Sequence, residues 1–313
     1  MSDIYITIII ALIGTLVTFW VGYISAKQIK KHGVDISENF KNTSKMISQI
    51  TGLFAASQMV GINTAYENRG VALLERDAQG NDAQSFLRYL KEEPKLIVVG
   101  STLLGLRMYV TKLAQYLRDR KERNYETKFL LTHPCFSSLR EDQEKRSAGE
   151  IGQELEDSIR FLKNDCGLEL NTSIRFYKGT PTCFMIITSN AMLLNPYPYQ
   201  TEAFKSFCLE VRRIEKDESK TETMISDILN VIDSDRFRNE IEGIIRTPEW
   251  KKYDYSYDKK PDIYGQFYWY HYFLPWYSKQ VVTYAEFEQI CKKCTFVKGG
   301  LAKQCQMQQT KNP

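Results

Sequence analysis

Apolar residues follow three different patterns along this chain, and each pattern predicts a different kind of element. The first is an apolar run without a charged residue over residues 4–26, followed by Lys27, Lys30 and Lys31. A run of about 20 apolar residues is long enough to cross a bilayer as one helix. Because the lysines lie on its C-terminal side, the positive-inside rule predicts a single-pass protein of the inner (cell) membrane, with the N-terminus outside and residues 27–313 in the cytoplasm.

The apolar run and the segment after it each carry a stripe on one helix face. Small residues recur every four positions in the run, at Gly14, Thr18, Gly22 and Ala26. Such a stripe lets two helix backbones approach closely in a membrane. Over residues 33–60 the apolar positions have the spacing of an amphipathic helical neck. We predict a homo-oligomer that forms through the anchor or the neck, with packing of the neck on the next domain as the alternative.

The third pattern is an alternation of short apolar runs and amphipathic segments. The runs predict strands, and apolar positions three and four residues apart predict helices. The expected strands are 95–100, 128–132, 173–177, 182–188, 192–195 and 207–212, and the expected helices are 103–122, 150–163 and 224–245. This order predicts the α/β fold class: a mixed sheet with helices on both faces, preceded by the single N-terminal transmembrane helix.

Aromatic side chains are concentrated over residues 250–277, and the stretch from Phe267 to Trp276 is nearly continuous. This density predicts a strand that is packed on both faces and ends at Pro275. The alternatives are a contact surface for a partner or a membrane, which includes Trp269 and Trp276, and a platform for stacking bases.

The string from Asn195 to Tyr199 holds two prolines and two tyrosines. Prolines stiffen the backbone into an extended conformation. The string therefore predicts a rigid exit from a strand, and the alternative is a loop that presents Tyr197 and Tyr199 to a partner.

Composition and charge narrow the possible partners. The chain has 313 residues and a net charge of +4, with charges of both signs mixed, so nucleic acid is not a favoured partner. Its seven cysteines are odd in number and irregularly spaced, which is typical of a reducing compartment rather than a disulfide framework. Cys291 and Cys294 form a CxxC, whereas a structural zinc site needs four ligands. We expect no metal and no cofactor, and whether these two thiols bind a metal stays open.

Polar and basic residues follow three of the expected strands, where α/β proteins collect their ligands. The candidate ligand-binding residues are Gly100, Ser101, Thr102, His133, Arg140, Arg146, Lys178 and Thr180. The first three end a strand immediately before a helix, whose free amides favour an anion. We predict that hydroxyls, amides and cations converge on one phosphate-sized group. The alternative is that the hydroxyls are helix caps and the cations form a solvated face.

The order of these elements resembles one phospholipase D-like module, over residues 66–215. In that superfamily, the segment matching residues 181–190 carries the histidine, lysine and aspartate of the HKD motif. In this chain the histidine and lysine positions hold Thr182 and Phe184, or Pro181 and Cys183 in the other register. The resemblance therefore implies a degenerate module, a pseudoenzyme that keeps phosphate or nucleotide binding without hydrolysis. No catalytic residue is assigned.

Four regions follow from these patterns. They are a transmembrane anchor with its basic flank (1–32), the neck (33–60), a cytosolic α/β domain (61–297, with the phospholipase D-like core at 66–215 and a helical, aromatic part at 216–297), and a flexible tail (298–313). The expected function is a membrane-anchored sensor, effector or interaction protein. It binds a phosphate-containing ligand or a protein partner without hydrolysing it, and the resemblance implies bacterial antiviral defence. The alternative is a membrane-bound phosphodiesterase or nucleotide-processing enzyme with a non-standard site.

Overall fold

The computed structural model describes residues 60–75, 85–197, 202–214, 233–245 and 263–291, and residues 45 and 57 singly. The chain divides into two compact units, 1–59 and 60–313. The description that follows concerns the second unit. The expected neck, the flexible tail, and the stripe of Gly14, Thr18, Gly22 and Ala26 lie outside the described residues, apart from the single neck positions.

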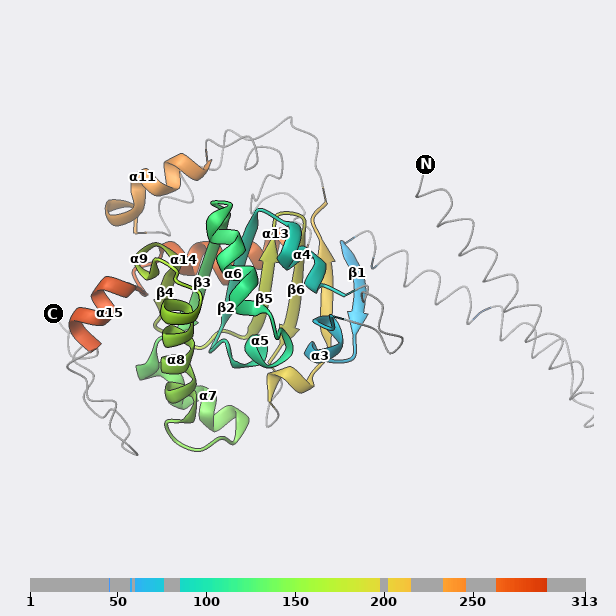
Figure 1. Cartoon of the computed structure of the whole chain (residues 1–313), viewed down its shortest axis with the longest axis horizontal. Helices are drawn as coiled ribbons and strands as arrows, with labels where there is room; N and C mark the ends of the chain where they lie inside the picture. Colours follow the sequence, from blue (N-terminus) through green and yellow to red (C-terminus); the bar gives the residue numbers. More distant parts are fainter. Residues whose placement is uncertain are drawn as a thin grey trace, which may run out of the picture. The chain divides into compact units, whose positions relative to one another are not determined.

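An eight-stranded mixed sheet forms the centre of the second unit (Figure 1). The strands are β1 (Ile62–Tyr66), β2 (Lys95–Gly100), β3 (Glu126–Thr132), β4 (Ile174–Tyr177), β5 (Cys183–Thr188), β6 (Ala191–Pro196), β7 (Cys208–Arg212) and β8 (Val281–Thr283). Their spatial order is β1-β7-β6-β5-β2-β3-β4-β8. The β2, β3 and β4 strands run parallel, and every other pair is antiparallel. The expected mixed sheet is thereby confirmed, and β1 and β8 are additions to it.

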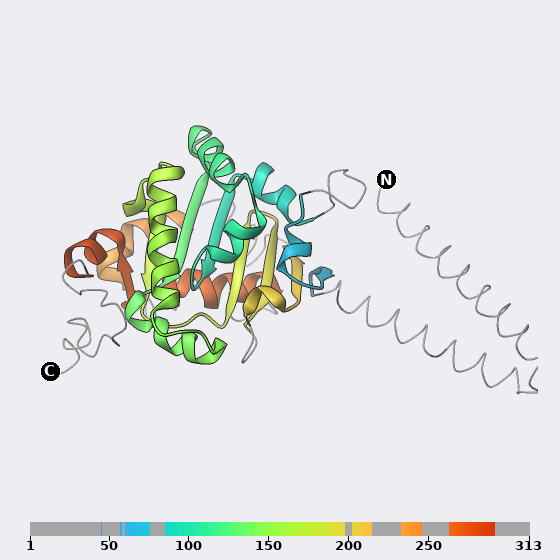
Figure 2. The ribbon, with the colours of Figure 1, turned by 60° about the horizontal axis from the view of Figure 1, so that its bottom comes forward.

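Helices cover both faces of the sheet, as expected (Figure 2). One face carries α3 (Arg69–Ala72), α4 (Leu87–Glu92), α5 (Leu104–Tyr109), α6 (Leu113–Glu122), α8 (Glu150–Arg160), α9 (Leu170–Ser173) and α15 (Tyr284–Cys291). The other carries α11 (Ser234–Ile245), α13 (Ile263–Phe267), the π-helix η4 (Tyr268–Phe273) and α14 (Leu274–Tyr277). Helix α7 (Ser137–Glu144) follows the 3-10 turn η1 (Pro134–Phe136), and the π-helix η2 (Phe161–Asp165) extends α8.

The continuous apolar run of β2 explains why it lies at the centre of the sheet. Successive residues of a strand point to opposite faces. Val98 therefore packs in one core cluster, whereas Ile97 and Val99 pack in the other, and all three are buried. A strand covered on both faces has no position for an alternating polar residue, and this gives the run that the sequence shows.

The aromatic stretch is helical, so the expected strand is wrong. Residues 263–277 form α13, η4 and α14 without a strand. Buried aromatic pairs recur every four residues, with Tyr268 and Trp269 followed by Tyr272 and Phe273. Tyr270, between these pairs, is exposed. This spacing belongs to a helix packed against a sheet, and a strand would bury every second residue instead.

The expected fold also included an N-terminal transmembrane helix, and this part is corrected. Within the described ranges, no helix has both the length and the apolar character needed to cross a membrane. The run over residues 4–26 on which the expectation rested lies outside those ranges. We therefore state the fold class as α/β with a mixed sheet, and the single-pass inner-membrane localisation is not carried further.

Candidate functional site

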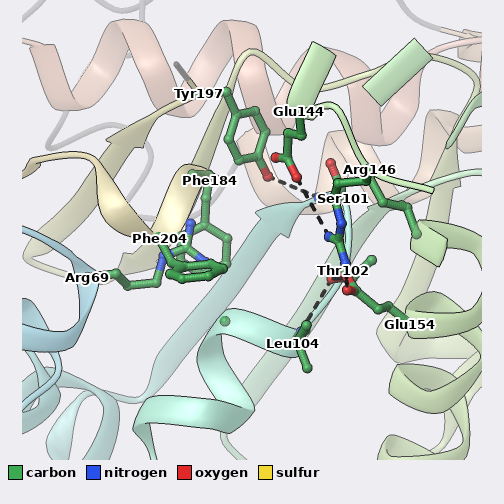
Figure 3. Close-up of a pocket in the computed structure, with 13 residues that line it drawn as sticks. Arg69, Ser101, Thr102, Leu104, Glu144, Arg146, Glu154, Phe184, Tyr197 and Phe204 are labelled. Carbon is green, nitrogen blue, oxygen red and sulfur yellow. Dashed lines mark hydrogen bonds and ion pairs between the residues drawn. The ribbon is translucent and has the colours of Figure 1, made fainter. Parts of the chain in front are cut away.

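A narrow pocket lies at the carboxyl end of β2, on the side of that strand where β5 and β6 are found (Figure 3). It encloses about 410 Å³ of space free of protein atoms, including the solvent at its mouth. The lining residues are Arg69, Ser101, Thr102, Leu104, Gly105, Glu144, Arg146, Ile151, Glu154, Phe184, Tyr197, Ala203 and Phe204. They come from α3, the β2–α5 connection, the start of α5, the end of α7, the α7–α8 connection, α8, β5, the residue after β6 and the 3-10 turn η3 (Ala203–Lys205).

Arg69 is a buried cation of this pocket, with 4% of its surface exposed. Its Nε donates a hydrogen bond to Asn195 Oδ1 at 3.0 Å, and its Nη2 donates to the same oxygen. The guanidinium carbon lies 3.8 Å from the centre of the Phe184 ring. Burial lowers the pKa of Arg69, yet an arginine keeps its proton in a protein. No carboxylate of the described residues forms an ion pair with Arg69, and the Glu144 carboxylate acts on its charge only through space.

Two local features bring the Arg69 guanidinium into the pocket. Helix α3 begins at Asn68, whose side chain accepts a hydrogen bond from Val71 N and so fixes the first turn. At the far end of the side chain, Nη1 points at Gly105 in the first turn of α5. A Cβ atom on Gly105 would lie only 2.1 Å from Nη1. Glycine at this position therefore leaves the room that the guanidinium occupies.

Two hydroxyl groups face the pocket beside Arg69. Ser101 N donates to the Tyr197 hydroxyl oxygen at 3.1 Å. The Ser101 Oγ atom is buried and has no hydrogen-bond partner among the described residues. Burial raises the pKa of Tyr197, so its phenol stays protonated and can donate. The other side of the Tyr197 ring is covered by Arg140, whose guanidinium carbon lies 3.7 Å from the ring centre.

The opposite wall of the pocket is a network of glutamates and Arg146. Arg146 Nη2 donates to Glu154 and, at 2.6 Å, to Glu150 Oε1. Glu154 also accepts from Thr102 Oγ1 at 3.1 Å. Glu144 accepts from Arg140 through one carboxylate oxygen, and its other oxygen lies 3.6 Å from Arg146 Nη1. Each of these acids therefore has a cation, in contrast to the buried guanidinium of Arg69.

Four of the eight expected ligand-binding residues gather at this pocket. Ser101, Thr102 and Arg146 line it, and Gly100 precedes them against the Phe184 ring. Arg140 lies behind Tyr197 and Glu144 without lining the pocket.

The amides at the start of α5, on which the sequence argument partly rested, already have partners. Leu103 N donates to Ser158 Oγ at 3.1 Å, and Leu104 N donates to Thr102 Oγ1 at 3.3 Å. In this structure the side chains of the pocket, and not these amides, face the open space.

The structure places His133, Lys178 and Thr180 away from the lining. The His133 ring packs against Phe176 and Phe287, and its Nδ1 accepts a hydrogen bond from Cys135 N. Burial, together with the nearby charge of Lys178, lowers the pKa of His133 to about 4. This histidine is therefore a neutral side chain of the core at physiological pH.

The residues expected to contact a partner are also placed by the structure. Trp269 and Trp276 are buried in the core below the sheet, with 7% and 1% of their surfaces exposed, so they form no contact surface. Tyr197 lines the pocket, and Tyr199 lies outside the described residues. No group of three or more metal-binding side chains is present in the described part of the chain.

Arg69, Glu144, Glu154, Phe184 and Phe204 were not expected in a site from the sequence. Arg69 carries no local signal, because a lone arginine at the start of a short helix looks like any surface residue. Glu154 forms an ion pair with Arg146, as acids on the surface of a helix commonly do with a nearby arginine.

No protein-family model matches this chain, and no curated protein matches it either. Among solved structures, the chain is similar to that of TrmBL2, an archaeal chromatin protein whose structure "shows a novel mode of DNA binding". The sequences are 10% identical, the match covers 68% of this chain and 70% of that chain, and the TM-score is 0.26. A likeness at this TM-score carries no argument about fold or function.

Proposed function

We propose that this protein binds a small phosphate-bearing ligand in the pocket at the end of β2 and does not hydrolyse it. The observation that carries the proposal is the buried guanidinium of Arg69, which forms no ion pair with a carboxylate of the described residues. A buried charge without a counter-charge costs several kcal/mol, on the order of 3–5 kcal/mol when one member of a pair is missing. An anionic ligand would remove that cost.

The chemistry of the neighbouring groups favours phosphate among anions. Arginine binds phosphate with a fork of parallel N–H donors. The hydroxyls of Ser101 and Tyr197 add two further donors from the sheet side of the pocket. A tetrahedral group with several acceptor oxygens can use all of these donors together, whereas a planar carboxylate has two oxygens only.

The absence of hydrolysis is supported by what surrounds the possible nucleophile. Covalent catalysis needs a nucleophile within hydrogen-bond distance of a base. Ser101 Oγ has no such partner in the described residues. The two glutamates of the lining are held by Arg146, Arg140 and Thr102, and the lining contains no histidine.

Thermal unfolding of the full chain tests this proposal. A ligand that binds only the folded state raises the melting temperature, and it adds about 2.7 kcal/mol at a concentration of 100 times Kd. We expect inorganic phosphate and AMP to raise Tm more than chloride does at equal ionic strength. Arg69→Met keeps the length of the side chain without its charge and should abolish the shift.

Arg160→Met is the matched control, because Arg160 is an exposed arginine whose partner is the neighbouring Asp157. It should leave the phosphate-dependent shift unchanged. An equal shift in the Arg69→Met variant would show that binding occurs elsewhere. Release of phosphate from AMP that depends on Ser101 would contradict the non-hydrolysing part of the proposal.

A further inference from the structure

Glu144 is the last residue of α7 and lines two hollows at once. One is the pocket of Arg69, and the other is a polar groove next to it that is lined by Lys145, Lys205 and Glu202, among others. Only 7% of the Glu144 side chain is exposed. Figure 3 shows its carboxylate between Tyr197 and Arg146, directed into the pocket. An acid in this position occupies space beside the proposed phosphate site.

Three arginines share the negative charge of Glu144. It accepts from Arg140, it lies 3.6 Å from Arg146 Nη1, and its charge also acts on Arg69 through space. A phosphate bound at Arg69 would bring two negative charges close to this carboxylate. Two like unit charges about 4 Å apart repel each other by about 4 kcal/mol at an effective dielectric constant of about 20. The ligand and the Glu144 carboxylate therefore compete for the same positive field.

We infer that Glu144 is an internal competitor of the ligand, and that it selects phosphate monoesters over diesters. This inference rests on the proposed function and specifies the ligand of the same pocket. A monoester carries close to two negative charges at neutral pH, because its second pKa is about 6. Exchanging one carboxylate for such a dianion increases the negative charge that faces the arginines. A diester carries one negative charge, so replacing the Glu144 carboxylate with a diester leaves the negative charge that faces the arginines unchanged.

The neighbouring groove gives the displaced carboxylate a place to go. Lys145 and Lys205 line it, and Lys205 is already paired with Glu202 at 2.6 Å. Movement of Glu144 also affects the turn that connects α7 to α8. Lys145 at the start of this turn has a φ of +56°, and Gly149 at its end has a φ of +84°. Glu141 anchors the end of the turn by accepting from Gly149 N at 2.9 Å. Binding should therefore change the exposure of the turn at residues 145–149.

The test compares AMP, a monoester, with cyclic AMP, a diester that has the same base. Calorimetric titration of the native full chain should give a lower Kd for AMP. In Glu144→Gln, which keeps the size of the side chain and removes its charge, Kd for cyclic AMP should fall by about tenfold, equivalent to about 1.4 kcal/mol. The preference for AMP should shrink. Asp157→Asn is the control, because Asp157 is a partly exposed acid of α8 that pairs with Arg160 and lines neither hollow; its Kd values should stay within about twofold of native, a change below about 0.5 kcal/mol.

The outcomes separate this inference from the proposed function. If neither probe binds the native chain nor Glu144→Gln, the proposed function fails. If AMP binds the native chain but Glu144→Gln binds both probes no more tightly, the competitor role is wrong. Equal affinities of the native chain for AMP and cyclic AMP would refute the selectivity.

A measurement on the native chain covers the case in which Glu144→Gln does not fold. Hydrogen exchange at residues 145–149 should become faster when AMP is added, because the Glu144 contacts to Arg140 and Arg146 are lost. Unchanged exchange at saturating AMP would contradict displacement of the carboxylate.

Discussion

Arg69 and Arg120 are both buried arginines on the same side of the sheet, and their surroundings differ completely. Arg120, on α6, donates to five oxygens at 2.6–3.2 Å. The acceptors are the carbonyls of Leu90, Glu93, Pro94 and Glu126, and Thr127 Oγ1. Arg69 donates to one amide oxygen, rests on one ring, and directs Nη1 towards a glycine at the edge of a pocket.

The comparison shows that burial of a charge does not by itself indicate function. Burial lowers the pKa of both guanidinium groups, to about 10 for Arg120. What distinguishes them is whether the protein itself fills their donor sites. A cation whose donors are all used ties elements together, whereas a cation with unused donors beside an open space is available to a ligand.

The largest expected effect is on stability, when Arg120 and Arg69 are each replaced by methionine. Arg120→Met should lower the free energy of unfolding by about 4 kcal/mol, because it removes a buried side chain whose five hydrogen bonds tie α6 to the ends of α4, β2 and β3. Arg69→Met should lower it by about 1 kcal/mol, because the loss of the Asn195 bonds is offset by removal of an unpaired buried charge. Denaturation in urea measures both values. Equal losses would mean that Arg69, like Arg120, has a purely structural role.

His133 lies outside the pocket and has a lowered pKa, so it tests whether a buried side chain with a shifted pKa can have a purely structural role. Its pKa is about 4 in the folded chain and 6.5 in the unfolded chain. The unfolded state therefore binds the proton first, and the free energy of unfolding falls as the pH drops from 6.5 towards 4. The shift corresponds to about 3 kcal/mol.

The variant His133→Asn removes the titration and keeps an acceptor for Cys135 N. Its stability should fall less steeply than that of the native chain over this pH range, and its affinity for AMP should be unchanged. Reduced affinity would place His133 in the site after all, as the sequence suggested.

Most of the sheet could be predicted from the sequence, because its central strands are buried on both faces and carry continuous apolar runs. The runs at residues 95–100 and 183–188 are of this kind. Strand β8 has only three residues, which is too short for any pattern. The sequence does not distinguish a helix from a strand in the aromatic stretch, because residues 267–273 are aromatic or histidine at every position and the four-residue spacing of the buried pairs appears only in the structure.

The site could be predicted only in part. The rule that ligands bind at the carboxyl ends of strands brought Ser101, Thr102 and Arg146 together, and all three line one pocket, whereas their binding of a ligand stays a prediction. The same rule failed for His133, whose ring turns towards β4 and α15, while the pocket lies on the β5 side of β2. Arg69 could not be found, because its burial depends on Asn195 and Gly105, which are distant in sequence.

Two glycine substitutions test the position of the Arg69 guanidinium, and their expected effects on stability are smaller. Gly105→Ala places a methyl group against Arg69 Nη1, so the guanidinium must move away. The end of a long side chain moves easily, and we expect a loss of about 1 kcal/mol in stability together with loss of the AMP-dependent rise in Tm. Gly243→Ala on α11 meets no atom within 4 Å and should stabilise the chain by about 0.5–1 kcal/mol without affecting that rise. Normal AMP binding in Gly105→Ala would argue against Arg69 as the anchor of the ligand.

The smallest effects concern two buried hydroxyls that lack a partner among the described residues. Thr132 Oγ1 lies in the core outside the pocket, and Ser101 Oγ lies at the pocket. Thr132→Val and Ser101→Ala should each stabilise the chain by about 0.5–1 kcal/mol, because each removes a buried polar atom that has no hydrogen bond. Only Ser101→Ala should weaken AMP binding, by about threefold to tenfold, which is the value of one hydrogen bond. Should both variants bind AMP as the native chain does, Ser101 Oγ would be an unpaired atom of the core like that of Thr132. The ligand would then be held by Arg69 and Tyr197 without it.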